Sequence, residues 1–189
     1  MKTPKVSVLL QTYDQAQYLG QSIESLLSQT LQDFELLIVD DCSPDDTQEV
    51  LQRYNSDHRI TQIRNPRNLG QHLSTNLHSQ RLQGEFVVFA SGDDVYLPEL
   101  FEAEVSVLEK HSSVGLVHVD GYIIDATGNR KHLISDMYSG TFGALSLNGY
   151  VMRGLDFFKL LLKANLIASH STCMLRRECL KSVGSFDES

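Results

Sequence analysis

Asp93 and Asp94 are adjacent carboxylates that follow an unbroken apolar run, residues 86–90, and a Ser-Gly pair. A short apolar run without alternation is typical of a strand buried on both faces, as in a parallel sheet covered by helices. Gly92 releases the chain from strand geometry, so both aspartates fall at the carboxyl end of the strand, where open α/β sheets bind ligands. Two neighbouring anions repel each other, so the pair favours a cation site. A solvated acidic turn, with Asp94 starting a helix, is the alternative.

Two further acidic pairs, Asp40-Asp41 and Asp45-Asp46, come after another apolar run. Ser43 fits the N-cap of a helix and Pro44 its first position, which places the second pair near the positive helix end. The first pair precedes this cap and lacks a structural explanation of that kind. The placement of acidic pairs after apolar runs indicates a cation-dependent site rather than a uniformly acidic surface.

The chain has 189 residues, 41% hydrophobic and 21% charged, which suits one globular domain with a proper core. Its formal net charge of −8 argues against a nucleic-acid partner bound through a basic surface. Three cysteines without metal-ligand spacing favour a reducing compartment. No stretch approaches the ~20 apolar residues of a membrane span, and a first strand beginning at Val6 leaves no room for a signal peptide. We therefore expect a cytoplasmic domain, free or peripheral at the inner membrane face, although a longer parent chain could carry an anchor.

Predicted strands and helices alternate in the first half of the chain. The predicted strands are Val6–Leu10, Phe34–Val39, Arg59–Ile63 and Phe86–Ala90. The first predicted helix begins after Asp14 as its N-cap, the second begins after Ser43 and runs to about Tyr54, the third covers about Gln71–Leu82, and the fourth begins at Pro98. This alternation predicts an α/β fold with a mostly parallel central sheet flanked by helices on both faces. The sequence has no Gly-x-Gly-x-x-Gly after its first strand and no Walker-type loop.

The second half of the chain has weaker signals. We expect strands over Val114–Val119 and Ser171–Leu175, a strand that runs into a turn at Tyr122–Asp125, and helices over Leu155–Leu162 and Arg177–Val183. The stretch Ser135–Gly154 holds four glycines and little periodicity, so we interpret it as a loop that acts either as a lid or as a plain connector.

Together these stretches resemble the family-2 glycosyltransferases of GT-A fold. Each matching piece is weak alone, but they occur in the family's order over nearly the whole chain. They are Val6–Asp14, Ser22–Thr30, Phe34–Thr47, Asn68–Gly70 with Asn76, Gly84–Phe86, the Asp-x-Asp region Ser91–Asp94, Leu97–Glu99, Cys173–Arg177 and Gly184–Glu188.

The resemblance implies a nucleotide-diphosphate sugar donor, a UDP- or dTDP-sugar, and a glycan or lipid-linked acceptor. It also implies Mn²⁺ or Mg²⁺ on the diphosphate, held by Asp93 as the last aspartate of Asp-x-Asp. Neutralising the diphosphate helps it to leave, and carboxylate oxygens suit these hard cations. The remaining donor-binding residues that the resemblance implies are Gln11, Thr12, Tyr13 and Asp40 for base and ribose, Arg67 from the loop before the third helix, and Ser91 with Asp94.

Two departures from the family pattern qualify the site. Ser91 stands where the family has the first aspartate of Asp-x-Asp, so one negative charge is missing, for which Asp94 could partly compensate. The family's general base, which inverts the anomeric centre by activating the acceptor hydroxyl, follows the Gly184–Glu188 stretch, so we expect it beyond Ser189. We therefore interpret residues 1–189 as the N-terminal part of one glycosyltransferase domain, with the nucleotide-sugar half at about 1–98 and the start of the acceptor half at about 99–189.

Two other functions compete with this interpretation. A non-catalytic module that binds sugar nucleotides or a partner, with a decayed site, would explain Ser91 and the missing base. A nucleotidyltransferase is disfavoured because Gln11-Thr12-Tyr13-Asp14 does not resemble the Gly- and Arg-rich signature expected after its first strand.

Overall fold

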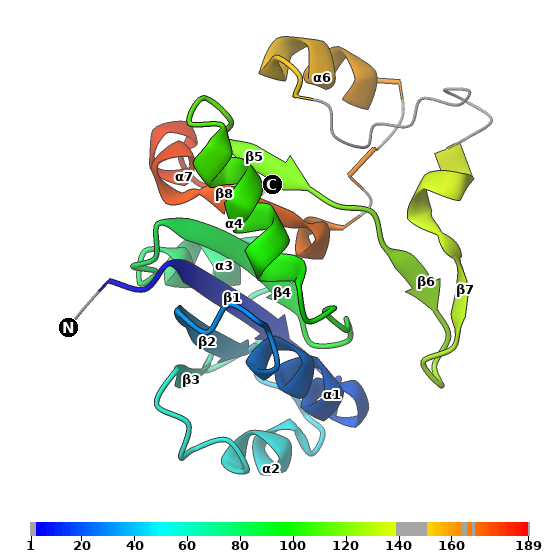
Figure 1. Cartoon of the computed structure of the whole chain (residues 1–189). Helices are drawn as coiled ribbons and strands as arrows, with labels where there is room; N and C mark the ends of the chain where they lie inside the picture. Colours follow the sequence, from blue (N-terminus) through cyan, green and yellow to red (C-terminus); the bar gives the residue numbers. More distant parts are fainter. Residues whose placement is uncertain (1–2, 139–150, 164–165, 168, 189) are drawn as a thin grey trace. The chain divides into compact units, whose positions relative to one another are not determined.

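The computed structural model describes residues 3–138, 151–163, 166–167 and 169–188. It contains a six-stranded sheet in the order β3-β2-β1-β4-β8-β5 (Figure 1). The strands β1 to β4 pair in parallel, whereas β8 is antiparallel to β4, so the predicted mostly parallel sheet is confirmed. The strands are β1 Val6–Thr12, β2 Phe34–Asp40, β3 Ile60–Arg64, β4 Phe86–Ser91, β5 Leu116–His118 and β8 Cys173–Arg176.

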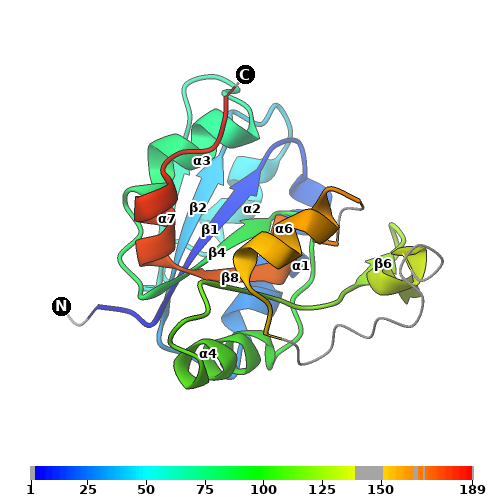
Figure 2. The same cartoon turned by 90° about the horizontal axis from the view of Figure 1, so that it is seen from above.

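Helices cover both faces of this sheet. The helices that cover it are α1 Ala16–Leu27, α2 Thr47–Gln52, α3 Gln71–Ser79, α4 Leu100–Lys110 and α7 Arg177–Val183. The described part of the chain also contains α6 Gly154–Leu161 and 3₁₀ helices at Ile134–Tyr138 and His170–Thr172. Figure 2 shows α3 and α7 on one side of the sheet and α1 and α4 on the other. None of these helices has the length and apolarity that crossing a lipid bilayer requires.

The central strands β1 and β4 are buried on both faces, which is why their apolar residues do not alternate with polar ones. Leu10 and Ala90 belong to the core on the side of α1 and α4, and Leu9 and Phe89 to the core on the side of α3 and α7. Full burial of one such leucine stabilises the fold by about 1.5–3 kcal/mol. A rigid centre of this kind can hold the strand ends in fixed positions.

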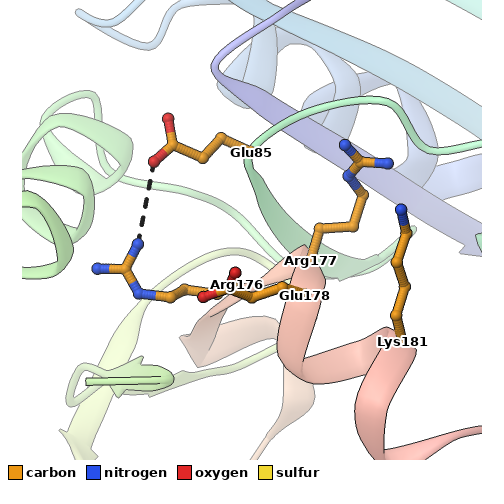
Figure 3. A pocket seen from close by; sticks show the side chains of 5 residues that line it. All are labelled: Glu85, Arg176, Arg177, Glu178 and Lys181. Atoms are coloured by element: carbon orange, nitrogen blue, oxygen red, sulfur yellow. Dashed lines mark ion pairs between the residues drawn. The ribbon is translucent and has the colours of Figure 1, made fainter. Parts of the chain in front are cut away.

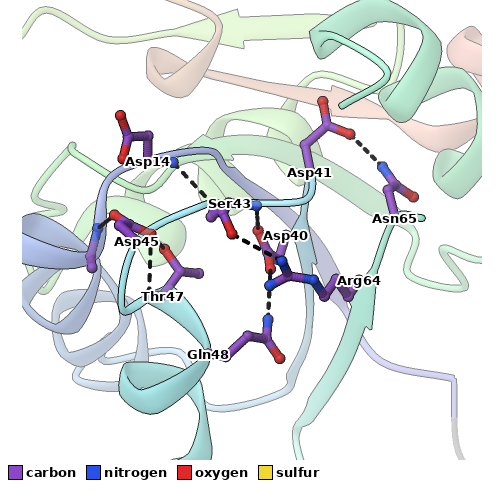
Figure 4. A network of polar contacts seen from close by, with 10 residues as sticks. Asp14, Asp40, Asp41, Ser43, Asp45, Thr47, Gln48, Arg64 and Asn65 are labelled. Atoms are coloured by element: carbon purple, nitrogen blue, oxygen red, sulfur yellow. Dashed lines mark hydrogen bonds and ion pairs between the residues drawn. The ribbon is translucent and has the colours of Figure 1, made fainter. Parts of the chain in front are cut away.

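The starts of α1 and α2 differ from the predicted caps. Asp14 has a left-handed backbone, with φ of 57°, and its own N–H donates to Ser43 Oγ at 3.1 Å. The first N–H of α1, at Ala16, donates instead to Asp45 Oδ2 at 2.8 Å, while Asp45 Oδ1 accepts from the N–H and hydroxyl of Thr47 at the start of α2 (Figure 4). The predicted caps Asp14 and Ser43 are therefore wrong, because one carboxylate serves both helices.

These hydrogen bonds lower the pKa of the Asp45 carboxyl. Burial by itself would raise the pKa of its carboxyl, but the hydrogen bonds from Thr47 and Ala16 together outweigh burial and hold the pKa below its ordinary value. The acidic segment after β2 is thus a structural joint between α1 and α2.

The predicted start of the fourth helix at Pro98 is two residues early, since α4 begins at Leu100. The Pro98 carbonyl accepts a hydrogen bond from the N–H of Thr30 at 2.8 Å, outside any helix. Smaller differences affect other ends: α2 stops at Gln52 instead of Tyr54, α3 at Ser79 instead of Leu82, β5 covers only Leu116–His118, and β8 begins at Cys173 after a 3₁₀ turn.

The chain divides into two compact units, Met1–Val117 with Met174–Ser189, and His118–Cys173. The second unit holds α6 and an antiparallel hairpin of β6, Tyr122–Ile124, and β7, Arg130–Leu133. Sequence analysis predicted the first strand of this hairpin and its turn but missed β7, whose residues are mostly charged. Of the loop predicted at 135–154, residues 139–150 lie outside the described residues.

The turn of the hairpin is built by Asp125. Its carboxylate accepts from the main-chain N–H groups of Thr127 and Asn129 and pairs with Lys131 Nζ at 2.6 Å. The contact with Lys131, together with these hydrogen bonds, holds the pKa of the Asp125 carboxyl well below its usual range. Asp125 therefore has the turn role that the sequence indicates.

Glu104 is a buried carboxyl in the apolar face of α4. Its side chain is 2% exposed, and its Oε1 has no hydrogen-bond partner among the described residues. Burial raises its pKa to about 9, so the side chain is neutral in the folded protein at neutral pH. Phe101, Val105 and Leu108 form an apolar stripe on α4, and Glu104, which sequence analysis missed, is buried within it.

We predict that Glu104→Gln removes a pH dependence of stability. The unfolded carboxyl titrates near 4.5 and the folded one near 9. The stabilisation from the retained proton is therefore complete below the unfolded value and declines by up to about 1.4 kcal/mol per pH unit as the pH rises toward the folded value. Urea unfolding of both proteins between about pH 5 and pH 8 measures this slope. Glu102→Gln, an exposed position on the same helix, should keep the wild-type slope, and equal slopes for wild type and Glu104→Gln would contradict the prediction.

Candidate functional site

The carboxyl ends of β1, β2 and β4 meet at one edge of the sheet. Gln11 of β1 is paired with Ser91 of β4, and Thr12 of β1 with Asp40 of β2. Four of the residues predicted for donor binding are therefore brought together by strand register alone. This edge is where parallel α/β sheets bind ligands.

The turn after β4 is pressed against the end of β1. The N–H of Gly92 donates to the carbonyl of Gln11 at 3.0 Å, and a Cβ at Gly92 would lie 2.8 Å from Thr12 Oγ1 and 2.9 Å from Gln15 Oε1. Only glycine fits this approach without displacing its neighbours. The same approach buries Thr12, which is 2% exposed. The Thr12 hydroxyl has no hydrogen-bond partner in the described part of the chain.

Two further contacts fix the turn at Ser91. Its N–H donates to the hydroxyl of the buried Tyr96 at 3.0 Å, and its carbonyl accepts from Ser22 Oγ of α1 at 3.0 Å. Ser91 Oγ donates to Asp93 Oδ1 at 2.6 Å. Asp93 itself is exposed and Asp94 half-buried, so the turn holds the Asp93 carboxylate at the surface in a set orientation.

These carboxylates fit a divalent cation when a phosphate completes its coordination. Among the described residues, no group of three or more His, Cys, Asp or Glu side chains is placed to hold a metal ion. Mg²⁺ typically takes one or two protein carboxylates together with substrate phosphates and waters, and Mn²⁺ accepts the same oxygen ligands. Asp93, with the hydroxyl of Ser91 2.6 Å from its Oδ1, offers oxygen ligands of this kind, and Asp94 follows it in sequence.

Gln11 connects the strand ends to α3. Its Nε2 donates to the carbonyl of Gln71 at 3.1 Å, and its Oε1 accepts from the hydroxyl of Thr75 at 2.9 Å. Tyr13, two residues further along, is 45% exposed. An exposed aromatic ring beside this edge suits stacking on a flat base.

Asp40 is fully buried, with 0% exposed, and both its oxygens are occupied. Oδ1 accepts from the N–H of Ser43 at 2.8 Å. Oδ2 accepts from Gln48 Nε2 and from Arg64 Nη1, each at 2.6 Å (Figure 4). The expectation that Asp40 lacks a structural explanation is thus wrong. A role with the base or ribose stays a prediction, and because Asp40 is fully buried it would require the groups that cover this carboxylate to move.

Asp41 holds the loop between β3 and α3, a role that sequence analysis missed. Its Oδ1 accepts from Asn65 Nδ2 at 2.7 Å and from the N–H of Leu69 at 2.9 Å, and its Oδ2 accepts from the N–H of Gly70 at 2.8 Å. Asp41 is 6% exposed. The available signal was its place next to Asp40, since neighbouring residues at a strand end point to opposite faces.

Arg67 lies on the loop that Asp41 holds and is exposed. Loop 65–70 begins where the N–H of Asn65 donates to the carbonyl of Asp40 at 2.8 Å. The structure therefore places the Arg67 main chain near the end of β2 while leaving its guanidinium in solvent. A phosphate or base contact by Arg67 stays a prediction.

A hollow of about 190 Å³ lies at the opposite edge of the sheet, beside the start of β4 (Figure 3). Its two arginines already have internal partners. Arg176 Nε donates to the carbonyl of Val114, its Nη1 lies 3.9 Å from Glu85, and Arg177 Nε donates to the carbonyl of Gly84. These arginines tie β8 and α7 to the sheet, so this hollow is a poor candidate for a diphosphate.

Several solved structures share the fold of this chain. S. aureus TarS 1–349 matches with a TM-score of 0.70 and 23% identity, covering 98% of this chain and 51% of that one; in complex with UDP-GlcNAc it matches with a TM-score of 0.67 and 21% identity, covering 95% and 47%. Mannosyltransferase PcManGT from Pyrobaculum calidifontis, in complex with GDP-Man and Mn²⁺, matches with a TM-score of 0.68 and 20% identity, covering 100% and 49%. The fold is therefore that of the GT-A glycosyltransferases.

The family follows from sequence. The model described as Glycosyl transferase family 2 matches residues 7–184, so the chain belongs to that family. Glycosyltransferase MJ1057 of Methanocaldococcus jannaschii is 35% identical over 132 residues, which is 68% of this chain and 46% of the relative. Chondroitin synthase of Escherichia coli is 30% identical over 138 residues, which is 73% of this chain and 20% of the relative. The chain spans less than half the length of both relatives.

We predict that Asp41→Ala lowers the free energy of unfolding by roughly 2–4 kcal/mol, because it leaves buried and half-buried N–H groups without their charged acceptor. Denaturant titration measures the change. Asp46→Ala, which removes an exposed aspartate from the same segment, is the matched control and should change stability by less than about 0.5 kcal/mol. Equal losses in the two variants would show that Asp41 does not hold the loop.

Proposed function

We propose that this chain forms the donor-binding part of a metal-dependent, inverting glycosyltransferase. The donor is a nucleotide-diphosphate sugar, a UDP- or dTDP-sugar, and the acceptor is a glycan or a lipid-linked sugar. The observation that carries the proposal is the turn Ser91–Asp93, which holds an exposed carboxylate next to the end of β1. Family membership supplies the reaction class.

Most of the predicted residues have a place in this proposal, while roles for Asp40 and Arg67 stay predictions. Tyr13 stacks on the base, and Gln11, held by α3 and next to the buried Thr12, lies against the nucleoside. Asp93 with Asp94 and Ser91 holds Mn²⁺ or Mg²⁺. When bound, the cation neutralises the charge that develops on the departing diphosphate.

The names of similar proteins support the donor and acceptor classes. TarS has a complex with UDP-GlcNAc, PcManGT has one with GDP-Man and Mn²⁺, and one relative is a chondroitin synthase. These are properties of those proteins, and they favour a nucleotide-sugar donor, a divalent metal and a polysaccharide product for this chain as well. No described residue matches the general base, which we place after the Gly184–Glu188 stretch.

We predict that the 189-residue chain binds UDP or dTDP only in the presence of Mn²⁺ or Mg²⁺. Asp93→Ala should abolish most of this binding, since it removes the exposed carboxylate that the cation requires, while glycosyl transfer by the 189 residues alone should be very weak. Isothermal titration calorimetry with each nucleotide, with and without metal, measures the affinity.

Asp46→Ala is the matched control, because it removes an exposed aspartate that no part of the proposal uses. Unchanged nucleotide binding in Asp93→Ala, or no binding by wild type with either metal, would refute the donor site. Nucleotide binding without transfer by the whole natural protein would favour the non-catalytic module. Strong transfer by the 189 residues alone would refute a base placed after Glu188.

Ser91→Asp should increase the affinity for metal and nucleotide by roughly tenfold, because the number of charged ligands tunes cation affinity. The same change should lower metal-free stability, since it sets a second carboxylate against the Asp93 carboxylate that Ser91 now contacts. Calorimetry and thermal unfolding with and without Mn²⁺ test both effects. Ser91→Ala, which removes the hydroxyl without adding charge, is the control, and a gain in affinity there would contradict the charge argument.

A further inference from the structure

The side chain of Asn76 on α3 hydrogen-bonds to the segment Gly184–Glu188, which we call the C-terminal segment. Asn76 Nδ2 donates to the carbonyl of Phe186 at 2.9 Å and to Glu188 Oε1 at 2.7 Å. Asn76 Oδ1 accepts from the N–H of Phe186 at 2.8 Å. One side-chain amide thus satisfies both main-chain groups of one residue, as a paired strand would.

The ring of Phe186 docks beside the same helix. It stacks on His72 with ring centroids 6.2 Å apart and meets the edge of Phe89 of β4 at 5.5 Å. Gly184, with φ of 94° at the end of α7, allows the chain to turn into this position. Figure 2 shows the C-terminal segment running along α3 toward the end of the sheet at which β1 and β2 terminate.

The same helix also holds the donor end of β1. The side chain of Gln11 contacts the Gln71 carbonyl and the Thr75 hydroxyl of α3. In sequence, Gln71 precedes His72 and Thr75 precedes Asn76. Helix α3 therefore fixes Gln11 and the C-terminal segment relative to each other within its first two turns. The last described residue, Glu188, is bound by Asn76, which follows Thr75 on this helix.

The hydrogen bonds between Asn76 and the C-terminal segment add little to global stability. Asn76 is half-buried, and residues 184–188 are exposed, so they contribute little to the hydrophobic core. Contacts of this kind open locally at small free-energy cost. What three hydrogen bonds from one amide provide here is a fixed position for the chain.

We propose that Asn76 is a positioning residue, which sets the C-terminal segment so that the chain following Glu188 enters the site at the donor edge. This rests on the proposed function, in which the base follows that segment. Asn76 touches neither donor nor metal in this arrangement. Its effect is on turnover, because misplacing a catalytic group by about 1 Å can reduce the rate by about a hundredfold.

The test uses Asn76→Asp in the whole natural protein. The new carboxylate faces the Phe186 carbonyl and the Glu188 carboxylate, so it repels the two groups that Asn76 now binds. We expect kcat to fall roughly ten- to a hundredfold, while the dissociation constant for the metal-bound nucleotide changes by less than about twofold. The double variant Asn76→Asp with Glu188→Gln restores a donor opposite residue 76 and should recover part of the lost kcat.

Asn55→Asp, an exposed asparagine, controls for the added charge and should leave kcat unchanged. Wild-type kcat in Asn76→Asp, or an equal loss of kcat and of nucleotide affinity, would overturn the proposal. Amide hydrogen exchange gives a readout that does not depend on activity. Asn76→Ala should speed exchange at the Phe186 N–H, and unchanged exchange would refute the claim that Asn76 holds the C-terminal segment. Failure of wild type to bind nucleotide would instead refute the proposed function and leave the exchange result standing.

Discussion

The parallel pairing of β1 with both β2 and β4 is the constraint on which the rest of this structure depends. It aligns Gln11 with Ser91 and Thr12 with Asp40, so residues about thirty and eighty positions apart in sequence share one edge. Because both faces of these strands are packed with apolar side chains, the alignment cannot slip without reversing the core. A polar site that would otherwise be scattered over loops is thereby held by the most rigid part of the fold.

Acidic residues near this edge divide into two groups with different physical roles. Asp40, Asp41 and Asp45 accept hydrogen bonds from N–H and guanidinium donors and serve to join β2, the loop before α3 and two helix starts. Asp93 is exposed and contacts the hydroxyl of Ser91. The aspartates after β2 thus mostly have structural roles. Exposure alone does not identify a cation ligand, because Asp14 and Asp46 are exposed as well, and Asp93 differs from them in its contact with Ser91 at the end of β4.

Local sequence patterns predicted the strands and the sheet because buried parallel strands have a distinctive unbroken apolar run. They also placed Gln11, Thr12, Asp40 and Ser91 at strand ends, which register then brought together. They failed where a partner comes from elsewhere in the chain: Asp45 caps α1 from the segment after β2, and Asp41 holds a loop that follows β3. The buried Glu104 was missed because a charged residue within an apolar stripe is ordinarily interpreted as the edge of the exposed face.

The way in which Asp41 holds its loop has a consequence for how this fold can change over evolution. Two of its hydrogen bonds are to main-chain N–H groups, at Leu69 and Gly70, and main-chain groups persist whatever side chain is present. Residues 66 and 67 can therefore be exchanged without loosening the attachment of the loop, whereas Asn68 Oδ1 also accepts from the Gly70 N–H at 2.9 Å. Position and chemistry are decoupled there, so a new ligand preference could arise by substitutions at the loop tip while the scaffold beneath stays unchanged.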